Sequence, residues 1–422
     1  MSSAIAIVDA NCYYVSCERA FNARLHKRPV VVLSNNDGCI IARSPEARAI
    51  PDLKMGTPIF RVEHVVDEHG VSVFSSNYSL YGDMSFRLVE ALQEFTPEVE
   101  VYSIDEAFIG IDAHPQQSFR DYGLEIKSKV YQWIGVPCSL GISTTKTLSK
   151  VAQRFTKKMP DVQGVLDLTV PSDQTQVLEE TPVEDVWGVG PAYSKLLREA
   201  GITTARKLRD ADRRWIRQRM TVVGARIVEE LRGTRCLPLE QCPQARKSVT
   251  CSRSFGNPVE SLDELREAVS SYTFRAAERL RRSRLTASVV TVFISTNRFS
   301  PDPQYSNART YELAQATDTT EELLEWALKG LAEIFRPGYR YKKAGVMFNR
   351  LVPVEQLSKR LYNDAKFERS RRLMSAIDQI NARYGRDTIR FGVARLESKW
   401  KTKFLKRSPR YTTCLREVMT VR

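Results

Sequence analysis

Two adjacent carboxylates, Asp105 and Glu106, stand between two short β-prone runs at residues 99–102 and 107–111. Asp and Glu are depleted from strands, so a strand–turn–strand segment that carries both at its turn needs a chemical reason. A solvated hairpin turn is one interpretation. The other is a site that uses both carboxylates, which requires a sheet whose neighbouring strands bring further ligands to the same point.

A third carboxylate occurs in a matching context near the N-terminus. Residues 4–8 are continuously apolar and predict a buried strand, and Asp9 follows this strand directly. If the strand lies beside those of the hairpin, Asp9, Asp105 and Glu106 converge. Three hard oxygen ligands suit Mg²⁺. Two such ions ~3.5–4 Å apart would serve an in-line attack at phosphorus.

The segments around these carboxylates resemble the two metal-binding motifs of the Y-family translesion DNA polymerases. The matching runs are Asp9-Ala10-Asn11-Cys12-Tyr13-Tyr14 and Ser103-Ile104-Asp105-Glu106-Ala107-Phe108. Within that family the chain is most similar to the UmuC-type polymerases, the catalytic subunits of bacterial DNA polymerase V and their plasmid-borne relatives. Residues 32–39, 74–78 and 185–190 carry this closer similarity. The resemblance extends over nearly the whole chain and is weakest near residues 353–370.

The resemblance implies a metal-binding role for four residues. Asp9 and Asp105 would bridge two Mg²⁺ ions, and Glu106 would bind the catalytic ion. The backbone carbonyl of Ala10 would bind the ion on the nucleotide side. Tyr14 stands at the position of the family's steric gate, a ring that excludes the 2′-hydroxyl of a ribonucleotide. An ordinary core tyrosine is the alternative for Tyr14.

The resemblance also implies two cations for the triphosphate of the incoming deoxynucleotide. Arg48 matches the family's phosphate-binding arginine, and Lys157 matches its phosphate-binding lysine. Lys158 is an adjacent alternative to Lys157.

The order of the predicted elements indicates an α+β, multidomain, right-hand polymerase. Residues 1–12 and 77–168 follow the order β-α-β-β-α-β, which predicts a ferredoxin-like palm, with small fingers (13–76) inserted after the first strand. Residues 169–240 predict a helical thumb. A Gly-apolar-Gly turn there, at 188–190, resembles a DNA-binding helix-hairpin-helix, and a Gly-rich helix connection without a ligand is the alternative. A second β-α-β-β-α-β unit at 245–352 corresponds to the little finger, and 353–422 would form a basic C-terminal domain.

Charge and composition favour a nucleic-acid partner. The net charge is +14, and residues 351–422 hold 18 Lys and Arg against 7 Asp and Glu. The eight cysteines form no C-x-x-C pair and all four histidines precede residue 115, which argues against zinc and for a reduced, cytoplasmic protein. No apolar run reaches about 18 residues, so we expect no membrane partner.

We therefore expect an error-prone, template-directed DNA polymerase that performs translesion synthesis in the bacterial SOS response. Primer-template DNA and dNTPs are the substrates, and the resemblance implies a processed UmuD-type dimer, the RecA filament and the sliding clamp as partners. Residues 356–362 could bind the clamp or form an ordinary linker. In the basic segment, an apolar helical stripe at 373–380 and an alternating run at 389–393 predict a folded structure. The alternative function is a non-catalytic DNA-binding or recruiting subunit, and a palm-fold nucleotide cyclase is a weaker rival.

Overall fold

The computed structural model describes residues 3–113, 116–241, 245–356, 364–385, 388–389 and 402–419. The chain forms two compact units. The first comprises Met1–Pro243 together with Leu405–Arg422, and the second comprises Gln244–Phe404. The second unit is therefore an insertion in the chain of the first, since the last residues return to the first unit.

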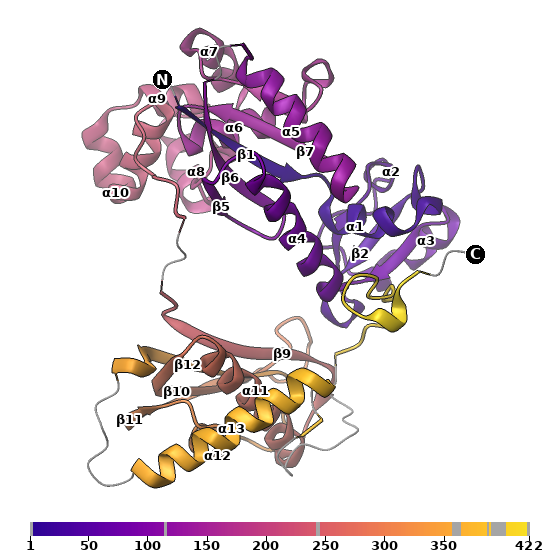
Figure 1. Ribbon diagram of the computed structural model, residues 1–422, viewed down its shortest axis with the longest axis vertical. Helices are drawn as coiled ribbons and strands as arrows, with labels where there is room; N and C mark the ends of the chain where they lie inside the picture. The colour runs from indigo at the N-terminus through magenta and orange to yellow at the C-terminus, as the bar shows by residue number, and fades with distance from the viewer. Residues whose placement is uncertain are drawn as a thin grey trace. The chain divides into compact units, whose positions relative to one another are not determined.

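A five-stranded sheet forms the centre of the first unit, with the strand order β5-β6-β1-β7-β8 (Figure 1). β1 pairs antiparallel with both β6 and β7, and β8 extends the edge parallel to β7. The elements of this region are β1 (Ser3–Ala10), α4 (Tyr78–Gln93), β5 (Val99–Val101), β6 (Glu106–Asp112), α5 (Phe119–Ile134), β7 (Cys138–Ser143), α6 (Lys146–Thr156) and β8 (Val165–Asp167).

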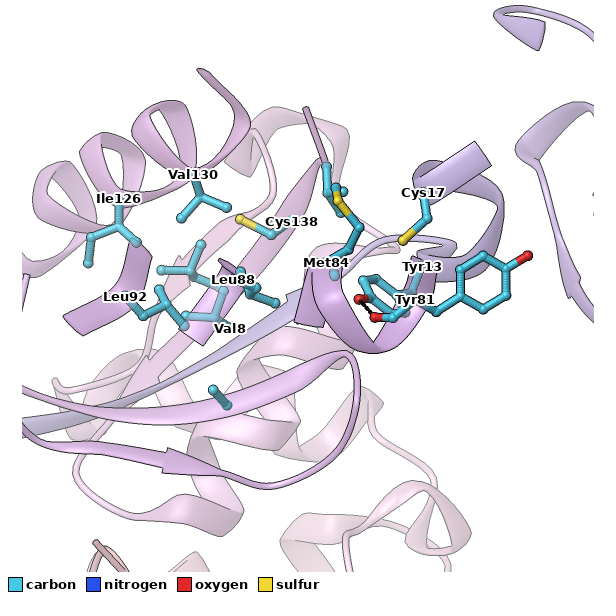
Figure 2. Close-up of a cluster of buried hydrophobic side chains, with 14 of the residues drawn as sticks. Val8, Tyr13, Cys17, Tyr81, Met84, Leu88, Leu92, Ile126, Val130 and Cys138 are labelled. Carbon is cyan, nitrogen blue, oxygen red and sulfur yellow. Dashed lines mark hydrogen bonds between the residues drawn. The ribbon is translucent and has the colours of Figure 1, made fainter. Parts of the chain in front are cut away.

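Both faces of the central strand β1 are covered, which explains why its residues 4–8 are apolar without a break. Alternate residues point to opposite faces of a sheet. Val8 and its even-numbered neighbours pack against α4 and α5, where Figure 2 shows Val8 with Leu88, Leu92, Ile126 and Val130. The odd-numbered Ile5 and Ile7 face the opposite side with Phe108.

A small sheet is inserted between β1 and α4, with the order β3-β2-β4. β2 pairs antiparallel with β3 and parallel with β4 around a separate apolar core. The elements are α1 (Tyr13–Phe21), β2 (Val30–Leu33), β3 (Ile40–Arg43), α2 (Pro45–Arg48), α3 (Glu63–Glu68) and β4 (Ser72–Ser75).

Four helices follow β8 and share a core with the apolar side of α6. They are α7 (Pro171–Glu180), α8 (Pro191–Glu199), α9 (Ala205–Asp210) and α10 (Arg213–Leu231). The connection into α8 contains Gly188 at φ +92°, a left-handed conformation that favours glycine. Gly190 is the N-cap residue of α8.

The second unit is a four-stranded antiparallel sheet in the order β11-β10-β12-β9, with helices packed on it. Its elements are β9 (Ser248–Val259), α11 (Leu262–Arg282), β10 (Leu285–Thr296), β11 (Ser306–Thr317), α12 (Thr320–Ile334), β12 (Tyr341–Pro353) and α13 (Asp364–Tyr384). Ser261 caps α11, because its hydroxyl accepts the N–H of Glu264 and donates to the carboxylate of the same residue. Arg281 of α11 forms a bidentate ion pair with Asp378 of α13, with N–O distances of 2.6 and 2.9 Å.

The segment 353–422 is shared between the two units, because α13 belongs to the second and residues 405–422 to the first. The predicted boundaries of palm, fingers, thumb and little finger stay predictions. The predicted clamp peptide at 356–362 and the alternating run at 389–393 fall largely outside the described residues. Across the described parts of the chain, no helix has the length and apolar character needed to cross a membrane.

Candidate active site

Strand alternation brings two of the predicted carboxylates to one face of the central sheet. Asp9 and Glu106 are directly opposite each other in the β1–β6 pair. Asp9 lies two residues after Ile7 on β1, and Glu106 lies two residues before Phe108 on β6, so both carboxylates lie on the face of Ile7 and Phe108. α6 packs on the sheet from this side.

The polar side of α6 holds both carboxylates. Lys150 Nζ donates to the two oxygens of Glu106 at 3.0 and 3.2 Å. Lys157 Nζ donates to Asp9 Oδ2 at 2.8 Å, and the amide of Gln153 donates to the same oxygen. Since residues three, four and seven apart share one side of a helix, Lys150 and Gln153 of α6 lie on the same side as Lys157, its C-cap residue.

A glycine in β7 lets α6 approach the sheet this closely. A Cβ added to Gly141 would lie 2.1 Å from the backbone oxygen of Ser149 and 2.2 Å from the backbone nitrogen of Gln153. Real Cβ atoms do not reach such distances, so any larger residue here would displace α6. The position of Lys150 and Gln153 therefore depends on Gly141.

Asp105 is oriented by the turn that precedes β6. The hydroxyl of Ser103 donates to Asp105 Oδ1 at 2.6 Å and accepts the backbone N–H groups of Asp105 and Glu106 at 3.3 and 3.0 Å. The backbone carbonyl of Asp105 accepts the N–H of Ala10 at 2.8 Å. The hairpin turn is thus fixed to the end of β1.

The three carboxylates line one cleft of about 560 Å³. Its lining residues are Asp9, Asp105, Glu106, Lys150, Gln153, Arg154, Lys157, Glu184, Asp185, Val186 and Trp187. Trp187 Nε1 donates to the hydroxyl of Tyr102 at 2.9 Å, and Lys150 Nζ lies 4.1 Å from the centroid of the Tyr102 ring. One wall of the cleft therefore includes the aromatic ring of Trp187, and the Lys150 ammonium lies against the neighbouring Tyr102 ring.

The donor set fits a hard divalent cation. Asp9, Asp105, Glu106 and the backbone of Ala10 offer oxygen atoms alone, the ligands that Mg²⁺ prefers. Among the described residues, no three His, Cys, Asp or Glu side chains are grouped closely enough to hold a metal ion in this conformation. The ammonium groups of Lys150 and Lys157 compensate the charge of Glu106 and Asp9 here.

Tyr14 lies beside this cleft in α1. Its ring stacks on Tyr81 of α4 with centroids 4.5 Å apart and an interplanar angle of 16°. Burial raises the pKa of the Tyr14 hydroxyl, and the nearby Tyr78 and Asp105 raise it further. Tyr14 is thus half-buried, neutral and within the electrostatic reach of the carboxylate site.

The two predicted phosphate-binding cations take different positions. Lys157 is part of the cleft, whereas Arg48 is exposed at the end of α2 and its guanidinium donates to the Cys12 thiol at 3.1 Å. Lys158, the alternative to Lys157, lies with its ammonium 5.7 Å from the Phe155 ring. The structure thus brings Asp9, Asp105, Glu106 and Lys157 into one cleft, and leaves Arg48 at the neighbouring β1–α1 junction.

Sequence reasoning missed Lys150, Gln153 and Trp187. A signal existed for the first two, because both lie at helical spacing from Lys157 on the polar side of an amphipathic helix. Trp187 had no such signal. It reaches the cleft from the helical region after β8, through its hydrogen bond to Tyr102.

Comparisons of sequence place the chain among known proteins. The impB/mucB/samB family matches residues 8–154, that family's C-terminal domain matches residues 246–361, and a domain of unknown function matches 371–421. Protein UmuC of Salmonella typhimurium is 40% identical, covering 99% of this chain and 100% of that protein. Protein MucB of Escherichia coli is 38% identical over 98% of each chain. A DNA polymerase IV of Moorella thermoacetica is 28% identical, over 92% of this chain and 96% of its own.

Solved structures show the same fold. A Y-family DNA polymerase chimera matches with a TM-score of 0.66 at 17% identity, covering 83% of this chain and 99% of its own. An insertion ternary complex of Dbh DNA polymerase matches with a TM-score of 0.55 at 16% identity and the same coverage. The expected mixed α/β fold of a Y-family polymerase is confirmed at this level. By sequence and by fold, the chain belongs to the impB/mucB/samB family, the UmuC-type branch of the Y-family DNA polymerases.

Proposed function

We propose that this chain is a template-directed, error-prone DNA polymerase that extends primers past damaged bases. The observation that carries the proposal is the pairing of Asp9 with Glu106 across two central strands, with Asp105 in the same cleft. The relatives named DNA polymerase IV and the Dbh ternary complex support a DNA substrate and an incoming nucleotide.

The topology supports a proposed division into four subdomains. The sheet order β5-β6-β1-β7 is consistent with a ferredoxin-like palm at residues 1–12 and 77–168. The small inserted sheet corresponds to fingers at 13–76, the helices after β8 to a thumb at 169–240, and the second sheet to a little finger at 245–352. A short fingers module leaves room above the nascent base pair, which suits a damaged template base.

Asp9, Asp105, Glu106 and the Ala10 carbonyl are the groups that would hold two Mg²⁺ ions. When bound, such ions neutralise charge on the triphosphate and favour the ionised form of the primer 3′-hydroxyl. Other side chains of the protein hold these carboxylates in position. Ser103 orients Asp105, and Gln153 fixes Asp9. Lys150 keeps Glu106 on the cleft side.

Fixed cations of the chain would bind the triphosphate. Lys157 has a half-exposed ammonium group at the edge of the cleft, and Arg48 lies beside Cys12 at the β1–α1 junction. A triphosphate that extends from the carboxylates toward α2 would lie within reach of both side chains. A guanidinium can bind two phosphate oxygens at once, whereas an ammonium acts as a point charge.

Tyr14 is proposed to select the sugar. Its ring is backed by Tyr81, so it cannot move aside without breaking a stacked pair. A ribonucleotide would place its 2′-hydroxyl against this ring and lose affinity, which is selection by steric exclusion. Tyr14→Ala should admit ribonucleotides and keep deoxynucleotide incorporation. Unchanged selectivity in a competitive ribo/deoxy assay would leave Tyr14 as a core residue.

The biological setting is proposed from the UmuC-type relatives. We place the chain in the SOS response to DNA damage, in the cytoplasm, with a processed UmuD-type dimer, the RecA filament and the sliding clamp as partners. Two observations support this setting. The 40% identity to protein UmuC extends over 99% of this chain, and the C-terminal segment is basic. A pull-down of each purified partner by the full chain tests it, and failure to retain any partner would contradict the setting without affecting the chemistry.

Primer extension by the full chain tests the proposed activity. Undamaged and abasic templates are copied with Mg²⁺ and all four dNTPs, with and without the proposed partners. We predict extension that depends on the cation and passes the lesion. DNA binding without any extension in the complete assembly would instead support the non-catalytic DNA-binding or recruiting subunit.

A further inference from the structure

The last residues of the described chain lie on the first unit, beside α1 and β2 (Figure 1). We call residues 405–411 the strap. The N–H of Ser75 donates to the carbonyl of Lys406 at 3.0 Å, and the N–H of Lys406 donates to the Ser75 hydroxyl at 2.8 Å. The ring of Tyr411 stacks on Phe21 with centroids 4.8 Å apart. The strap is therefore docked by main-chain and aromatic contacts, although it is far from these residues in sequence.

A buried polar cluster lies under the centre of the strap. It consists of Glu18 of α1, Asn77 and Tyr81 of α4, and Ser408 of the strap, and none of the four is more than 8% exposed. The two N–H groups of the Asn77 amide are shared among three strap oxygens, the Ser408 carbonyl and hydroxyl and the Pro409 carbonyl, each 2.9–3.0 Å from Nδ2. Ser408 Oγ then donates to Glu18 Oε1 at 2.9 Å, and the hydroxyl of Tyr81 donates to the same oxygen at 2.7 Å.

This cluster connects the strap to the predicted sugar gate. Tyr81 is fully buried, its hydroxyl is held by Glu18, and its backbone carbonyl accepts the hydroxyl of Tyr13 at 2.6 Å (Figure 2). The ring of Tyr14 stacks on the ring of Tyr81. Only two contacts, Ser408 to Glu18 and Glu18 to Tyr81, separate the strap from the ring that backs Tyr14.

Loss of the strap would leave polar groups of this cluster without their hydrogen-bond partners. The Asn77 amide would lose three acceptors, and Glu18 would lose one of its two hydrogen-bond donors in a buried place. Buried polar groups without partners are costly, so the cluster would admit water or rearrange. Either change alters the support behind Tyr81.

We infer that the strap is a positioning element of the nucleotide site, in which Ser408 and Asn77 fix Tyr81 and thereby the ring of Tyr14. The inference rests on the proposed role of Tyr14 in sugar selection. It assigns to the C-terminal segment an effect on which nucleotide is incorporated, in addition to any contact with DNA or partner proteins.

Two substitutions in the full-length chain test this coupling. Asn77→Asp keeps the side-chain oxygen that accepts the N–H of Leu80 at the start of α4, and removes the amide that binds the strap. Ser408→Glu places a second carboxyl against Glu18. Leu405→Ala is the matched control within the strap, because its side chain is 82% exposed and its backbone bond to Asp37 is unaffected.

Each variant is measured in two ways. Limited trypsin cleavage at Lys406 and Arg407 reports whether the strap is docked. Primer extension with competing ribo- and deoxynucleotides reports selectivity. We predict faster cleavage in the strap and a loss of selectivity of about tenfold for Asn77→Asp and Ser408→Glu, equal to ~1.4 kcal/mol. The Leu405→Ala variant should match the wild type in both.

Three results would overturn the inference. Cleavage at the wild-type rate in both variants would contradict the docking. Rapid cleavage with wild-type selectivity, in an enzyme whose Tyr14→Ala variant has lost selectivity, would contradict the coupling alone. If Tyr14→Ala itself leaves selectivity unchanged, the sugar-gate assignment fails and the coupling to it fails with it.

Discussion

Glu18 is a carboxyl that the folded chain keeps almost entirely from water. Burial raises its pKa above the ordinary value of 4.5, although the hydrogen bonds from Tyr81 and Ser408 lower it in part. At pH values between the pKa of Glu18 in the unfolded chain and its raised pKa in the folded chain, the folded state therefore holds a proton that the unfolded state has lost. It follows that this residue makes the wild type progressively less stable as pH rises through that interval.

Glu18→Gln tests this at the residue scale. The amide oxygen can still accept from Tyr81 and Ser408, and the side chain no longer titrates. We predict that the variant is more stable than the wild type at neutral pH, and that the difference shrinks as pH falls toward 4.5. The measurement is the difference in thermal unfolding midpoint across that range. A difference that does not vary with pH would show that Glu18 does not titrate there.

The sequence pointed to the three carboxylates and to Lys157, and it did not point to Lys150 or Gln153. Asp9, Asp105 and Glu106 could be found because each stands at the end of a strand-like run where an acidic residue is unusual. Helical spacing from Lys157 indicates the side of α6 that carries Lys150 and Gln153, but their contacts with the carboxylates depend on how closely α6 approaches the sheet at Gly141. That distance is a property of tertiary packing, and one sequence alone does not reveal it.

At the scale of elements, the packing of α6 on β7 decides the geometry of the site. Gly141→Ala should destabilise the fold by ~1–3 kcal/mol, the usual cost of overpacking. Displaced α6 would also carry Lys150 and Gln153 away from Glu106 and Asp9, so incorporation should fall. Gly82→Ala in α4 is the control, since its Cβ would meet no atom within 4 Å. Equal unfolding midpoints for the two variants would contradict the proposed role of Gly141.

Most helices and strands of the two sheets lie where the hydrophobic pattern predicts them. The exceptions have a physical reason. β8 has three residues, Val165–Asp167, too few to show a period, and it joins the sheet by pairing with β7. The strap has no regular pattern, because its contacts run through backbone groups, one serine and the ring of Tyr411.

At the scale of the whole molecule, the net charge of +14 predicts binding to DNA that weakens steeply with salt. Lys195 follows the glycine turn that enters α8, and its side chain is 80% exposed beside Glu199. If the turn binds a phosphate, Lys195→Gln should reduce the slope of log affinity against log salt by about 1. Lys129→Gln in α5 is the matched control. An unchanged slope for Lys195→Gln would favour a glycine connection without a ligand.

Charge at this scale predicts a basic C-terminal domain after residue 352, and that boundary stays a prediction. The structure assigns α13 to the second unit and residues 405–422 to the first. Charge patterns report on partners in solution. They do not show that Asn77 and Glu18 bind Ser408 more than three hundred residues away.

The central claim is that the three carboxylates carry out nucleotide transfer. Asp105→Asn keeps the size of the side chain and removes one ligand charge, and Asp112→Asn, at the far end of β6, is the matched control. The measurement is single-nucleotide incorporation with Mg²⁺ in the complete assembly, together with DNA affinity. We predict that Asp105→Asn loses about 10³-fold in rate, or ~4 kcal/mol, while its DNA affinity and the Asp112→Asn enzyme remain at wild-type levels. Incorporation by Asp105→Asn at near the wild-type rate would contradict the account.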